Sequence, residues 1–282
     1  MPELPEVETI ARTLCDGCGD VDSILDHTIE HVSVLWERSI AAPTVPEFLR
    51  RIQGQSIQQV GRRGKYIVIT LSHDTLLIHL RMSGDLRVEQ RSEHDGPALR
   101  KHDRVIFSLN EKICLIFEDA RKFGRIWLLT DPQVEVGKLG PEPLSEQLTA
   151  DAFYAMLCRH KRQLKPLLMD QTFLAGLGNI YTDEALFKAR LHPLMMAQTL
   201  TPEQAAVLLR AIKDTLREGI RKNGASIDWV YRGGDFQNHF FVYGRKGQPC
   251  LVCGTPIERL VVGQRGTHIC PHCQAQNKED VS

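Results

Sequence analysis

The sequence predicts an α+β fold of two domains, and three observations lead to it. Residues 30–130 contain short runs of Val, Ile, Leu and Phe separated by charged or Gly-containing turns, a spacing typical of a β-sandwich or barrel. Residues 137–149, GKLGPEPLSEQLT, are rich in Gly, Pro and polar residues and mark a boundary. Beyond them the apolar residues repeat with helical spacing, and four cysteines follow near the C-terminus.

The first element is a predicted helix over residues 4–15. Pro5 fits its first turn, and Glu6 and Glu8 lie near the positive end of the helix dipole. Its apolar residues share one face: Val7, Ile10, Ala11 and Leu14. The strands expected after it are Tyr66–Leu71, Leu76–Leu80, Val105–Leu109, Ile113–Phe117 and Arg125–Leu129.

The second half is predicted to be helical. Helices are expected over Ala150–Leu157, Gln163–Asp170, Ile180–Ala189 and 201–223. The last one has Thr201 as its N-cap, with Gln204 completing a capping box, and Gly224 ends it. Residues 225–240 are expected to form a loop, and residues 241–273 a small cysteine-bearing unit.

Composition and charge narrow the possible classes of protein. The 282 residues are 42% hydrophobic and 25% charged, as in a soluble globular protein, and no apolar run approaches the roughly 20 residues of a membrane span. No membrane role is expected, and the N-terminus lacks a secretion signal, so a cytoplasmic location is predicted. The formal net charge is zero.

The charges are nevertheless segregated along the chain. Residues 1–30 carry eight acids (Glu3, Glu6, Glu8, Asp16, Asp20, Asp22, Asp26 and Glu30) and one base, Arg12. The later basic clusters are Arg62-Arg63-Lys65, Arg121-Lys122-Arg125, Arg159-His160-Lys161-Arg162-Lys165 and Arg245-Lys246. They can line a cationic groove on a neutral molecule, or each can be a solvated surface face.

The four C-terminal cysteines predict a metal site. Cys250 and Cys253 form one C-x₂-C pair and Cys270 and Cys273 another, with Gly254 following the first pair. This spacing favours one tetrahedral Zn²⁺ over disulfides or idle thiols, and a site filled by four thiolates is structural. No nucleotide or redox cofactor is expected. A further pair, Cys15 and Cys18, is interpreted as ordinary thiols at a helix end, and Cys114 and Cys158 as small core residues.

The N-terminal residues MPELPEVET are unusual because removal of Met1 would make Pro2 the terminal residue. A terminal proline is a secondary amine that can form a cationic imine with an aldehyde carbon, and Glu3 and Glu6 lie within a turn of it. Taken alone, these residues are better explained as the lead-in to a helix.

Several separated motifs, considered together, favour the catalytic interpretation of Pro2 over the helix lead-in. The N-terminus, HLRMSG (79–84), DARKFG (119–124), FLAGLGNIYTDEALF (173–187) and VYGRKGQPCLVCG (242–254) resemble the formamidopyrimidine-DNA glycosylase and endonuclease VIII family from residue 2 to about 273. The resemblance implies an N-terminal β-sandwich with flanking helices, a helix-two-turn-helix domain, a zinc-finger β-hairpin, and DNA bound between the domains. The expected ranges are a catalytic domain at 2–131, a linker at 132–148, the helical DNA-binding domain at 149–225 and the zinc-finger hairpin at 240–274.

The resemblance also implies roles for individual residues. Those expected to be catalytic are Pro2 as the imine-forming nucleophile, Glu3 as the acid, Lys65 as an aid to elimination, and Arg265 in the second elimination. Those expected to contact DNA are His102, Arg121, Lys161, Asn179, Met82 and Phe123. His160 is the alternative to Lys161. Met82, Arg121 and Phe123 are expected to fill the gap left by an extruded nucleotide; outside this context Met82 and Phe123 would be assigned to the core.

The function expected is that of a bifunctional glycosylase/AP lyase of base excision repair that acts as a monomer on damaged double-stranded DNA. The Met-Arg-Phe trio favours oxidised purines (8-oxoguanine and formamidopyrimidines), whereas the composition of residues 225–240 leaves open the oxidised pyrimidines of the endonuclease VIII branch. A non-catalytic zinc-containing DNA-binding protein is the alternative from another class. A metal-dependent nuclease is disfavoured, because the four-thiolate site is closed and no Asp, Glu and His cluster suits Mg²⁺.

Overall fold

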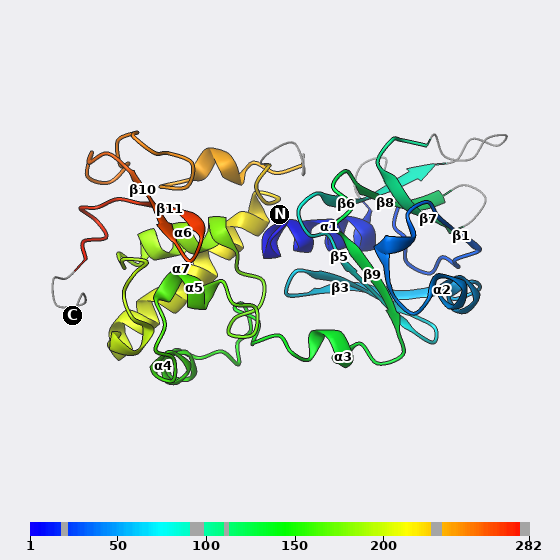
Figure 1. Ribbon diagram of the computed structural model, residues 1–282, viewed down its shortest axis with the longest axis horizontal. Helices are drawn as coiled ribbons and strands as arrows, with labels where there is room; N and C mark the ends of the chain where they lie inside the picture. The colour runs from blue at the N-terminus through cyan, green and yellow to red at the C-terminus, as the bar shows by residue number, and fades with distance from the viewer. Residues whose placement is uncertain (18–21, 91–98, 110–112, 227–232, 277–282) are drawn as a thin grey trace. The chain divides into compact units, whose positions relative to one another are not determined.

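The computed structural model (Figure 1) describes residues 1–17, 22–90, 99–109, 113–226 and 233–276. The chain divides into two compact units. The first comprises residues 1–138 and 225–234, and the second residues 139–224 and 235–282. The chain therefore leaves the first unit at residue 139, returns to it at residue 225 and leaves it again at residue 235.

Two sheets form the centre of the first unit. The four-stranded sheet has the order β1 (His31–Val34), β7 (Asp103–Ser108), β8 (Ile113–Asp119) and β6 (Gly84–Gln90). The five-stranded sheet has the order β2 (Ile40–Ala42), β9 (Arg125–Leu129), β5 (Thr75–His79), β4 (Tyr66–Leu71) and β3 (Ile57–Arg63). All neighbours are antiparallel except β2 and β9. The predicted sandwich is confirmed.

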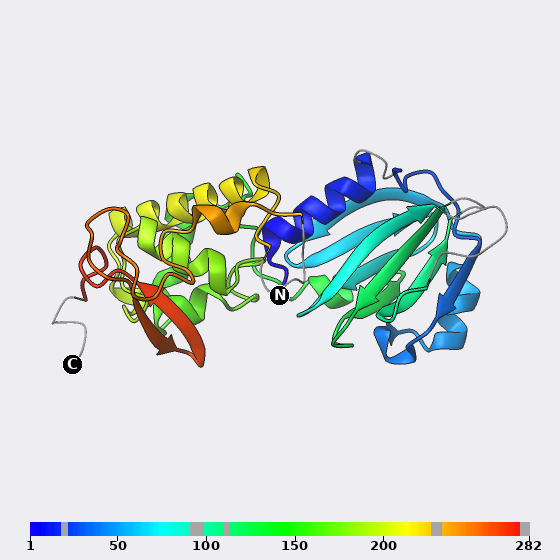
Figure 2. The same ribbon diagram turned by 90° about the horizontal axis from the view of Figure 1, so that it is seen from above.

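Helices flank this sandwich. They are α1 (Leu4–Asp16), the short 3₁₀ helix η1 (Glu37–Ser39), α2 (Val45–Ile52) and α3 (Gln133–Val136). The predicted apolar face of α1 is buried, and the helix packs beside β3 and β4 (Figure 2). Its residues join Phe48 of α2 and Phe107 and Phe117 of the four-stranded sheet in one core. Burial of this core is the main stabilising term for the unit.

The second unit is helical with a small β-hairpin. It contains α4 (Ala150–Cys158), α5 (Leu164–Leu168), α6 (Asn179–Lys188), η2 (Ala197–Thr199), α7 (Pro202–Arg221), η3 (Phe236–His239), β10 (Glu258–Val262) and β11 (Arg265–Ile269). The predicted capping box is present, because Gln204 N donates to Thr201 Oγ1 and Thr201 N donates to Gln204 Oε1. α7 packs against α4 and α6, and the hairpin packs against α6.

The cysteines outside the C-terminal group differ in their environments. Cys114 is buried in β8, as predicted, but Cys158 is exposed at the end of α4, so its assignment to the core was wrong. α4 buries Phe153 and Leu157, and one further residue turns about 100° around a helix, which carries position 158 off that face. Cys15 is half-buried against the core of the first unit, and Cys18 lies outside the described residues.

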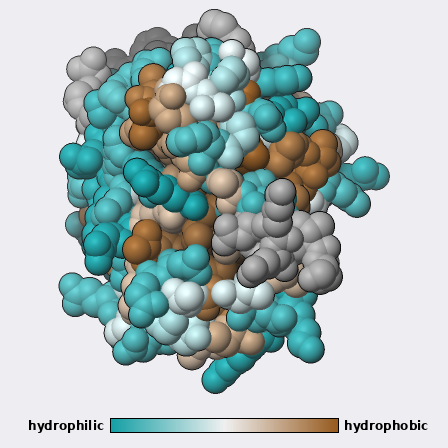
Figure 3. All heavy atoms as spheres, turned by 90° about the vertical axis from the view of Figure 1, so that its left-hand side faces the viewer, coloured by the Kyte–Doolittle hydropathy of each residue, from teal (hydrophilic) through white to brown (hydrophobic). Residues whose placement is uncertain are grey.

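Figure 3 shows a mainly hydrophilic face interrupted by small hydrophobic areas. In the second unit the most exposed apolar side chains include Leu251, Val252 and Val261 of the cysteine-bearing segment. Among the helices that the structure describes, none has the length and apolar character needed to span a membrane.

Candidate functional site

The start of α1 is fixed by one buried carboxylate. Glu6 accepts a hydrogen bond from Glu3 N through Oε2 at 2.7 Å and one from Ala225 N through Oε1 at 2.7 Å. The side chains of Glu3 and Glu6 are each only 3% exposed. With Met1 in place, Pro2 is buried as well. The two residues predicted to carry the chemistry thus lie on a backbone held firmly at its third residue.

An ion pair places this helix beside Lys65. Arg62 Nε of β3 lies 2.9 Å from Glu8 Oε2 in the second turn of α1. Because β3 ends at Arg63, the turn that carries Lys65 follows directly. The N-terminal half of α1 therefore lies alongside the strand that leads to Lys65 (Figure 2). Lys65 is itself 5% exposed, so its position is set by packing rather than by solvent.

His79 lies in β5, opposite the residue that follows Lys65 in the chain. It pairs with Tyr66 across β4 and β5, and the two rings meet edge to face at 4.7 Å. Its Nδ1 accepts a hydrogen bond from Arg81 N at 3.0 Å. Burial, reinforced by the charges of Arg81 and Lys65, lowers the pKa of His79 to about 3. The ring is therefore neutral near pH 7. It adds no positive charge to those of Lys65 and Arg81 beside it.

Two loops at this end of the sandwich carry the predicted trio. The β5–β6 loop (residues 80–83) presents Met82, and the β8–β9 loop (residues 120–124) presents Arg121 and Phe123. Met82 is 36% and Phe123 49% exposed, so neither belongs to the core. The Arg121 guanidinium lies 5.1 Å from the centre of the Phe123 ring. These side chains are available to an external partner.

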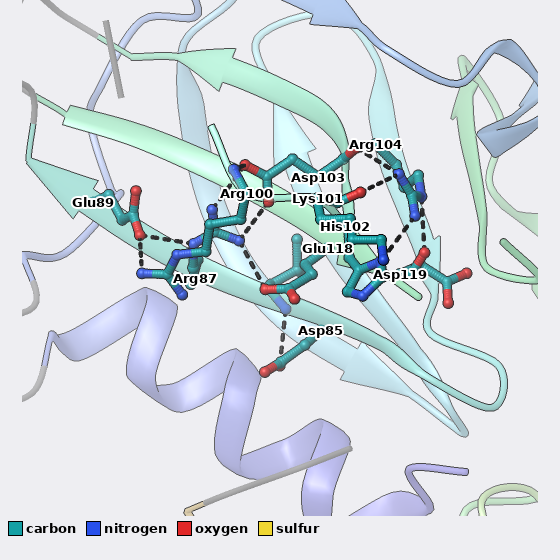
Figure 4. A network of polar contacts seen from close by, with 11 residues as sticks. Asp85, Arg87, Glu89, Arg100, Lys101, His102, Asp103, Arg104, Glu118 and Asp119 are labelled. Atoms are coloured by element: carbon teal, nitrogen blue, oxygen red, sulfur yellow. Dashed lines mark hydrogen bonds and ion pairs between the residues drawn. The ribbon is translucent and has the colours of Figure 1, made fainter. Parts of the chain in front are cut away.

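His102 precedes β7 at the same end. Its backbone carbonyl accepts a hydrogen bond from Asp119 N at 2.9 Å, and its Nδ1 lies 3.4 Å from an Arg104 nitrogen (Figure 4). The ring is half-buried. On the far side of the same network, Arg87 contacts Asp103 at 2.8 Å and Glu118 at 2.9 Å. The position of His102 is thus tied to a set of partly buried ion pairs.

A second group of predicted residues lies in the second unit. Asn179 begins α6, and its Nδ2 donates to Gly266 O at 3.1 Å. Lys165 Nζ donates to the same carbonyl at 3.1 Å and lies 2.6 Å from Asp183 Oδ1. Arg265, the residue before this glycine, is exposed at the start of β11. Through Lys165 and Asn179, α5 and α6 therefore hold the β10–β11 hairpin at Gly266, directly beside Arg265.

Lys161 and its alternative His160 differ in exposure. Lys161 is exposed between α4 and α5, whereas the His160 ring packs edge to face on Phe173 with 5.3 Å between centres. His160 therefore serves packing within the unit. Lys161, like Arg159 of the same basic cluster, has an exposed side chain.

Several residues of the basic clusters form ion pairs or hydrogen bonds within the protein. Arg62 pairs with Glu8, and Arg245 donates to Phe241 O and Pro249 O. Lys165 is fully buried and paired with Asp183, so its charge is neutralised inside the unit. In these three clusters, part of the positive charge is therefore already engaged within the protein.

The four C-terminal cysteines converge. Their Sγ atoms all lie within 4.8 Å of one another, with Cys250–Cys273 at 3.9 Å and Cys253–Cys270 at 3.5 Å. Tetrahedral Zn²⁺ with ligands at about 2.3 Å places sulfurs about 3.8 Å apart, whereas a disulfide needs about 2.05 Å. Val252 N and Cys273 N each point to a cysteine sulfur at 3.4 Å. The residues fit a zinc ion.

α6 also anchors the chain that enters this cysteine group. The buried Glu184 carboxylate accepts hydrogen bonds from the backbone N–H groups of Phe241, Val242 and Tyr243 at 2.9, 3.0 and 2.8 Å. Burial raises the pKa of Glu184, and the three donors act in the opposite direction. Gln274 closes the other end, because its Nε2 donates to Leu191 O at 3.0 Å.

The described residues thus define a two-sheet unit with a buried acid at its N-terminus and a helical unit with a four-cysteine hairpin, the domain types of a zinc-finger DNA glycosylase. Three family models match in chain order. They are the formamidopyrimidine-DNA glycosylase N-terminal domain over residues 1–126, the H2TH domain of the same enzyme over residues 139–230, and a zinc finger found in FPG and IleRS over residues 247–276. The chain belongs to the formamidopyrimidine-DNA glycosylase family.

Full-length relatives agree with this assignment. The formamidopyrimidine-DNA glycosylase of Pelotomaculum thermopropionicum is 44% identical over 97% of this chain and 99% of its own. The solved structure of MutM in complex with carbocyclic 8-oxo-G containing DNA has a TM-score of 0.87, is 35% identical, and covers 98% of this chain and 100% of that one. The Lactococcus lactis FPG with a FAPY-dG containing DNA also has a TM-score of 0.87 and 35% identity, over 97% and 100%.

Sequence reasoning missed several residues that position these groups. His79 and Ser83 lie within the HLRMSG motif and Asp119 opens DARKFG, so both motifs contained the signal although their other members were chosen. Asp183 and Glu184 lie within the FLAGLGNIYTDEALF motif, and Lys165 ends one of the basic clusters. Their positioning contacts could not be inferred from these motifs, because the partners lie at least 18 residues away along the chain. Of the 225–240 loop, residues 227–232 lie outside the described residues.

Proposed function

We propose that this protein is a bifunctional DNA glycosylase/AP lyase that removes oxidised purines and then cleaves the strand, with Pro2 as nucleophile, acting as a monomer on damaged double-stranded DNA. The observation that carries the proposal is the start of the chain, where Pro2 precedes the buried acid Glu3 on a backbone clamped by Glu6. The neighbours solved with 8-oxo-G and FAPY-dG containing DNA support the choice of oxidised purines.

The chemistry starts once Met1 is removed and the Pro2 nitrogen becomes a secondary amine. Attack of this amine on the deoxyribose C1′ breaks the bond to the base, and the base leaves with a proton. Cleavage of the C1′–O4′ bond, with protonation of O4′, then gives a cationic imine between Pro2 and C1′. The imine acidifies the C2′ protons, so that the 3′ phosphate and then the 5′ phosphate can be eliminated. Glu3 is assigned the proton transfers at this sugar. Lys65 and Arg265 are assigned to the phosphates that leave.

DNA contacts are assigned to exposed residues of both units. Arg121, Lys161 and Arg265 are exposed cations, and Asn179 and His102 are half-buried polar groups. Met82 and Phe123 supply an apolar wedge for the gap left by the extruded nucleotide, and Arg121 supplies hydrogen bonds to the orphaned base. One structural Zn²⁺ held by Cys250, Cys253, Cys270 and Cys273 would brace the hairpin that carries Arg265.

The proposed domain assignment follows from these roles. Residues 2–131 form the catalytic domain, 132–148 the linker, 149–225 the DNA-binding helices and 240–274 the zinc-finger hairpin. Residues 225–234 group with the first unit, and Ala225 N contributes a hydrogen bond to the catalytic domain itself.

The nucleophile is tested by borohydride trapping on a duplex that contains 8-oxoguanine. Wild-type protein should form a stable covalent adduct, and Lys65→Met should still form it, because the amine belongs to Pro2. An acetylated N-terminus should abolish trapping. Glu3→Gln should lower base release by about 100-fold or more while cleavage at a pre-formed abasic site falls less, because that substrate has no base to expel.

Pro5→Ala is the matched control, since Pro5 is also a buried proline at the start of α1 but has no place in the chemistry. It should trap like the wild type. Undiminished trapping by the N-terminally blocked protein would identify a lysine amine as the nucleophile instead, and absence of any adduct from wild-type protein would leave only DNA binding.

A further inference from the structure

The two loops with the predicted wedge side chains both pass between the sheets at one end of the sandwich. The β5–β6 loop leads from the five-stranded to the four-stranded sheet, and the β8–β9 loop leads back. Gly84 at the end of one and Asp119 at the start of the other are directly paired residues of β6 and β8. The loops are therefore neighbours in space although they are 36 residues apart in the chain.

One carboxylate joins the two loops. Asp119, only 1% exposed, accepts a hydrogen bond from the hydroxyl of Ser83 in the β5–β6 loop through Oδ1. The same oxygen accepts from Arg121 N at 3.1 Å, and Oδ2 accepts from Gly124 N at 2.7 Å. Ser83 Oγ also receives Arg121 N at 3.0 Å. A single side chain thus fixes both ends of the β8–β9 loop and the last residue of the β5–β6 loop.

Both loops have conformations that need such support. Arg81 and Lys122 are non-glycine residues with φ of 53° and 61°, a left-handed region that costs energy for a side-chain-bearing residue. A Cβ on Gly124 would lie 2.4 Å from Phe117, and one on Gly84 would lie 2.5 Å from Leu80 O. The loops are tight, and the geometry that exposes Met82 and Phe123 is imposed by their surroundings.

A second side chain links this carboxylate residue to His102. Arg104, 8% exposed, donates its Nε to Asp119 O at 2.8 Å and its Nη1 to Lys101 O at 3.2 Å and to Asp103 O at 3.0 Å (Figure 4). Another Arg104 nitrogen approaches His102 Nδ1. Lys122 is held from outside, where its Nζ lies 3.9 Å from the centre of the Trp36 ring. The segment before β7 and the β8–β9 loop therefore share one buried set of contacts.

From these contacts we infer that Asp119 is a positioning residue for lesion extrusion and for reading the opposite base, acting with Ser83 through the Met82, Arg121 and Phe123 side chains. The inference rests on the proposed function, because it needs a nucleotide that is extruded and a gap that is filled. Asp119 need not touch DNA for this role. A rigid wedge offsets the cost of unstacking only if its side chains are already held in place.

The test compares Asp119→Asn with wild-type protein on two substrates. Asparagine keeps one acceptor oxygen but replaces the other by an N–H₂ donor, so one loop loses its anchor. Excision of 8-oxoguanine from duplex DNA should fall by about tenfold or more, and any difference between the excision rates opposite cytosine and opposite adenine should shrink. Cleavage of a single-stranded oligonucleotide with a pre-formed abasic site should stay within about twofold of wild type, because nothing has to be extruded or read.

Ser83→Ala and Asp74→Asn complete the design. Ser83→Ala removes one of the anchoring hydrogen bonds. It should lower two ratios by a smaller factor than Asp119→Asn does: duplex excision relative to abasic-site cleavage, and the difference in excision between the two opposite bases. Asp74 is a matched control, since it is 7% exposed and accepts hydrogen bonds from Arg51, Gln55 and Thr130 in contacts separate from both loops. Asp74→Asn should leave both ratios unchanged.

Equal losses on both substrates for Asp119→Asn, no loss on either, or the same change in Asp74→Asn would each overturn the inference. These results are distinct from failure of the proposed function. In that case wild-type protein itself would neither excise 8-oxoguanine nor form a borohydride adduct.

Discussion

At the scale of single residues, His79 shows how burial sets a charge state. The neutral ring accepts a hydrogen bond from Arg81 N and packs on Tyr66 beside Lys65. In the unfolded chain its pKa returns to the ordinary value near 6.5. As pH falls below that value the unfolded chain takes up a proton that the folded protein does not, so stability is lost as pH falls from about 6.5 toward about 3.

We therefore expect the folded first unit to lose about 1.4 kcal/mol of stability through His79 between pH 7.5 and pH 5.5. His79→Gln should lack this component, because glutamine accepts from Arg81 N without titrating. Urea unfolding followed by tryptophan fluorescence measures it. His73→Gln, at an exposed position, should keep the wild-type dependence. An unchanged pH dependence in His79→Gln would contradict the assignment.

At the scale of elements, the second unit depends on a buried ion pair between α5 and α6. Lys165 and Asp183 side chains are both 0% exposed, and Asp183 Oδ2 also accepts from His268 N of β11 at 2.9 Å. Lys165→Met leaves a buried carboxylate without its cation, which should cost about 3–5 kcal/mol. Lys165→Met with Asp183→Asn should cost less than Lys165→Met alone, because no charge then remains and the asparagine oxygen can still accept from His268 N.

Urea unfolding followed by helical circular dichroism measures both costs. Lys188→Met is the control, because the Lys188–Glu218 pair is partly exposed at 22% and 27% and its loss should cost about 0–1 kcal/mol. A double variant that costs as much stability as Lys165→Met alone, or more, would show that the two charges are not coupled.

The elements that could be predicted from the sequence are those with a strong local signal. β4 and β9 were placed at their observed bounds because each is a continuous apolar run between charged turns, and α7 was placed by its capping box. α2 and β3 were missed because they are short or polar and bury few side chains, as with Phe48 and Ile52 in α2. Periodicity cannot detect an element that has only two buried residues.

The residues of the candidate site also fall into those with a local sequence signal and those without one. Cys250, Cys253, Cys270 and Cys273 were found because metal-ligand spacing is local, and their Sγ atoms do converge. The hub at Asp119 could not be predicted from spacing, because its acceptors serve donors in two loops whose proximity depends on the pairing of β6 with β8. Contacts of this kind belong to the tertiary fold.

At the scale of the whole molecule, the two units should respond differently to removal of the metal. Chelation of zinc should loosen the cysteine hairpin and lower the unfolding temperature of the second unit, while the sandwich keeps its own transition, because its core contains no metal ligand among the described residues. Calorimetry with metal analysis by mass spectrometry measures this. Cys250→Ser should lose the metal, and Cys15→Ser should retain it. A zinc-free preparation with full DNA cleavage would refute the structural role.

The hydrogen bond from Ala225 N to Glu6 Oε1 has a consequence for biosynthesis. Its two residues are 219 positions apart, and residues 225–234 belong to the first unit. On the ribosome the sandwich strands emerge long before this segment, so the first unit can collapse early but cannot complete the bonding of its Glu6 carboxylate until most of the second unit has been synthesised. The hydrogen bond from Ala225 N is thus a late contact of Glu6, formed only after residues 139–224 have been synthesised, whereas the bond from Glu3 N can form as soon as α1 folds.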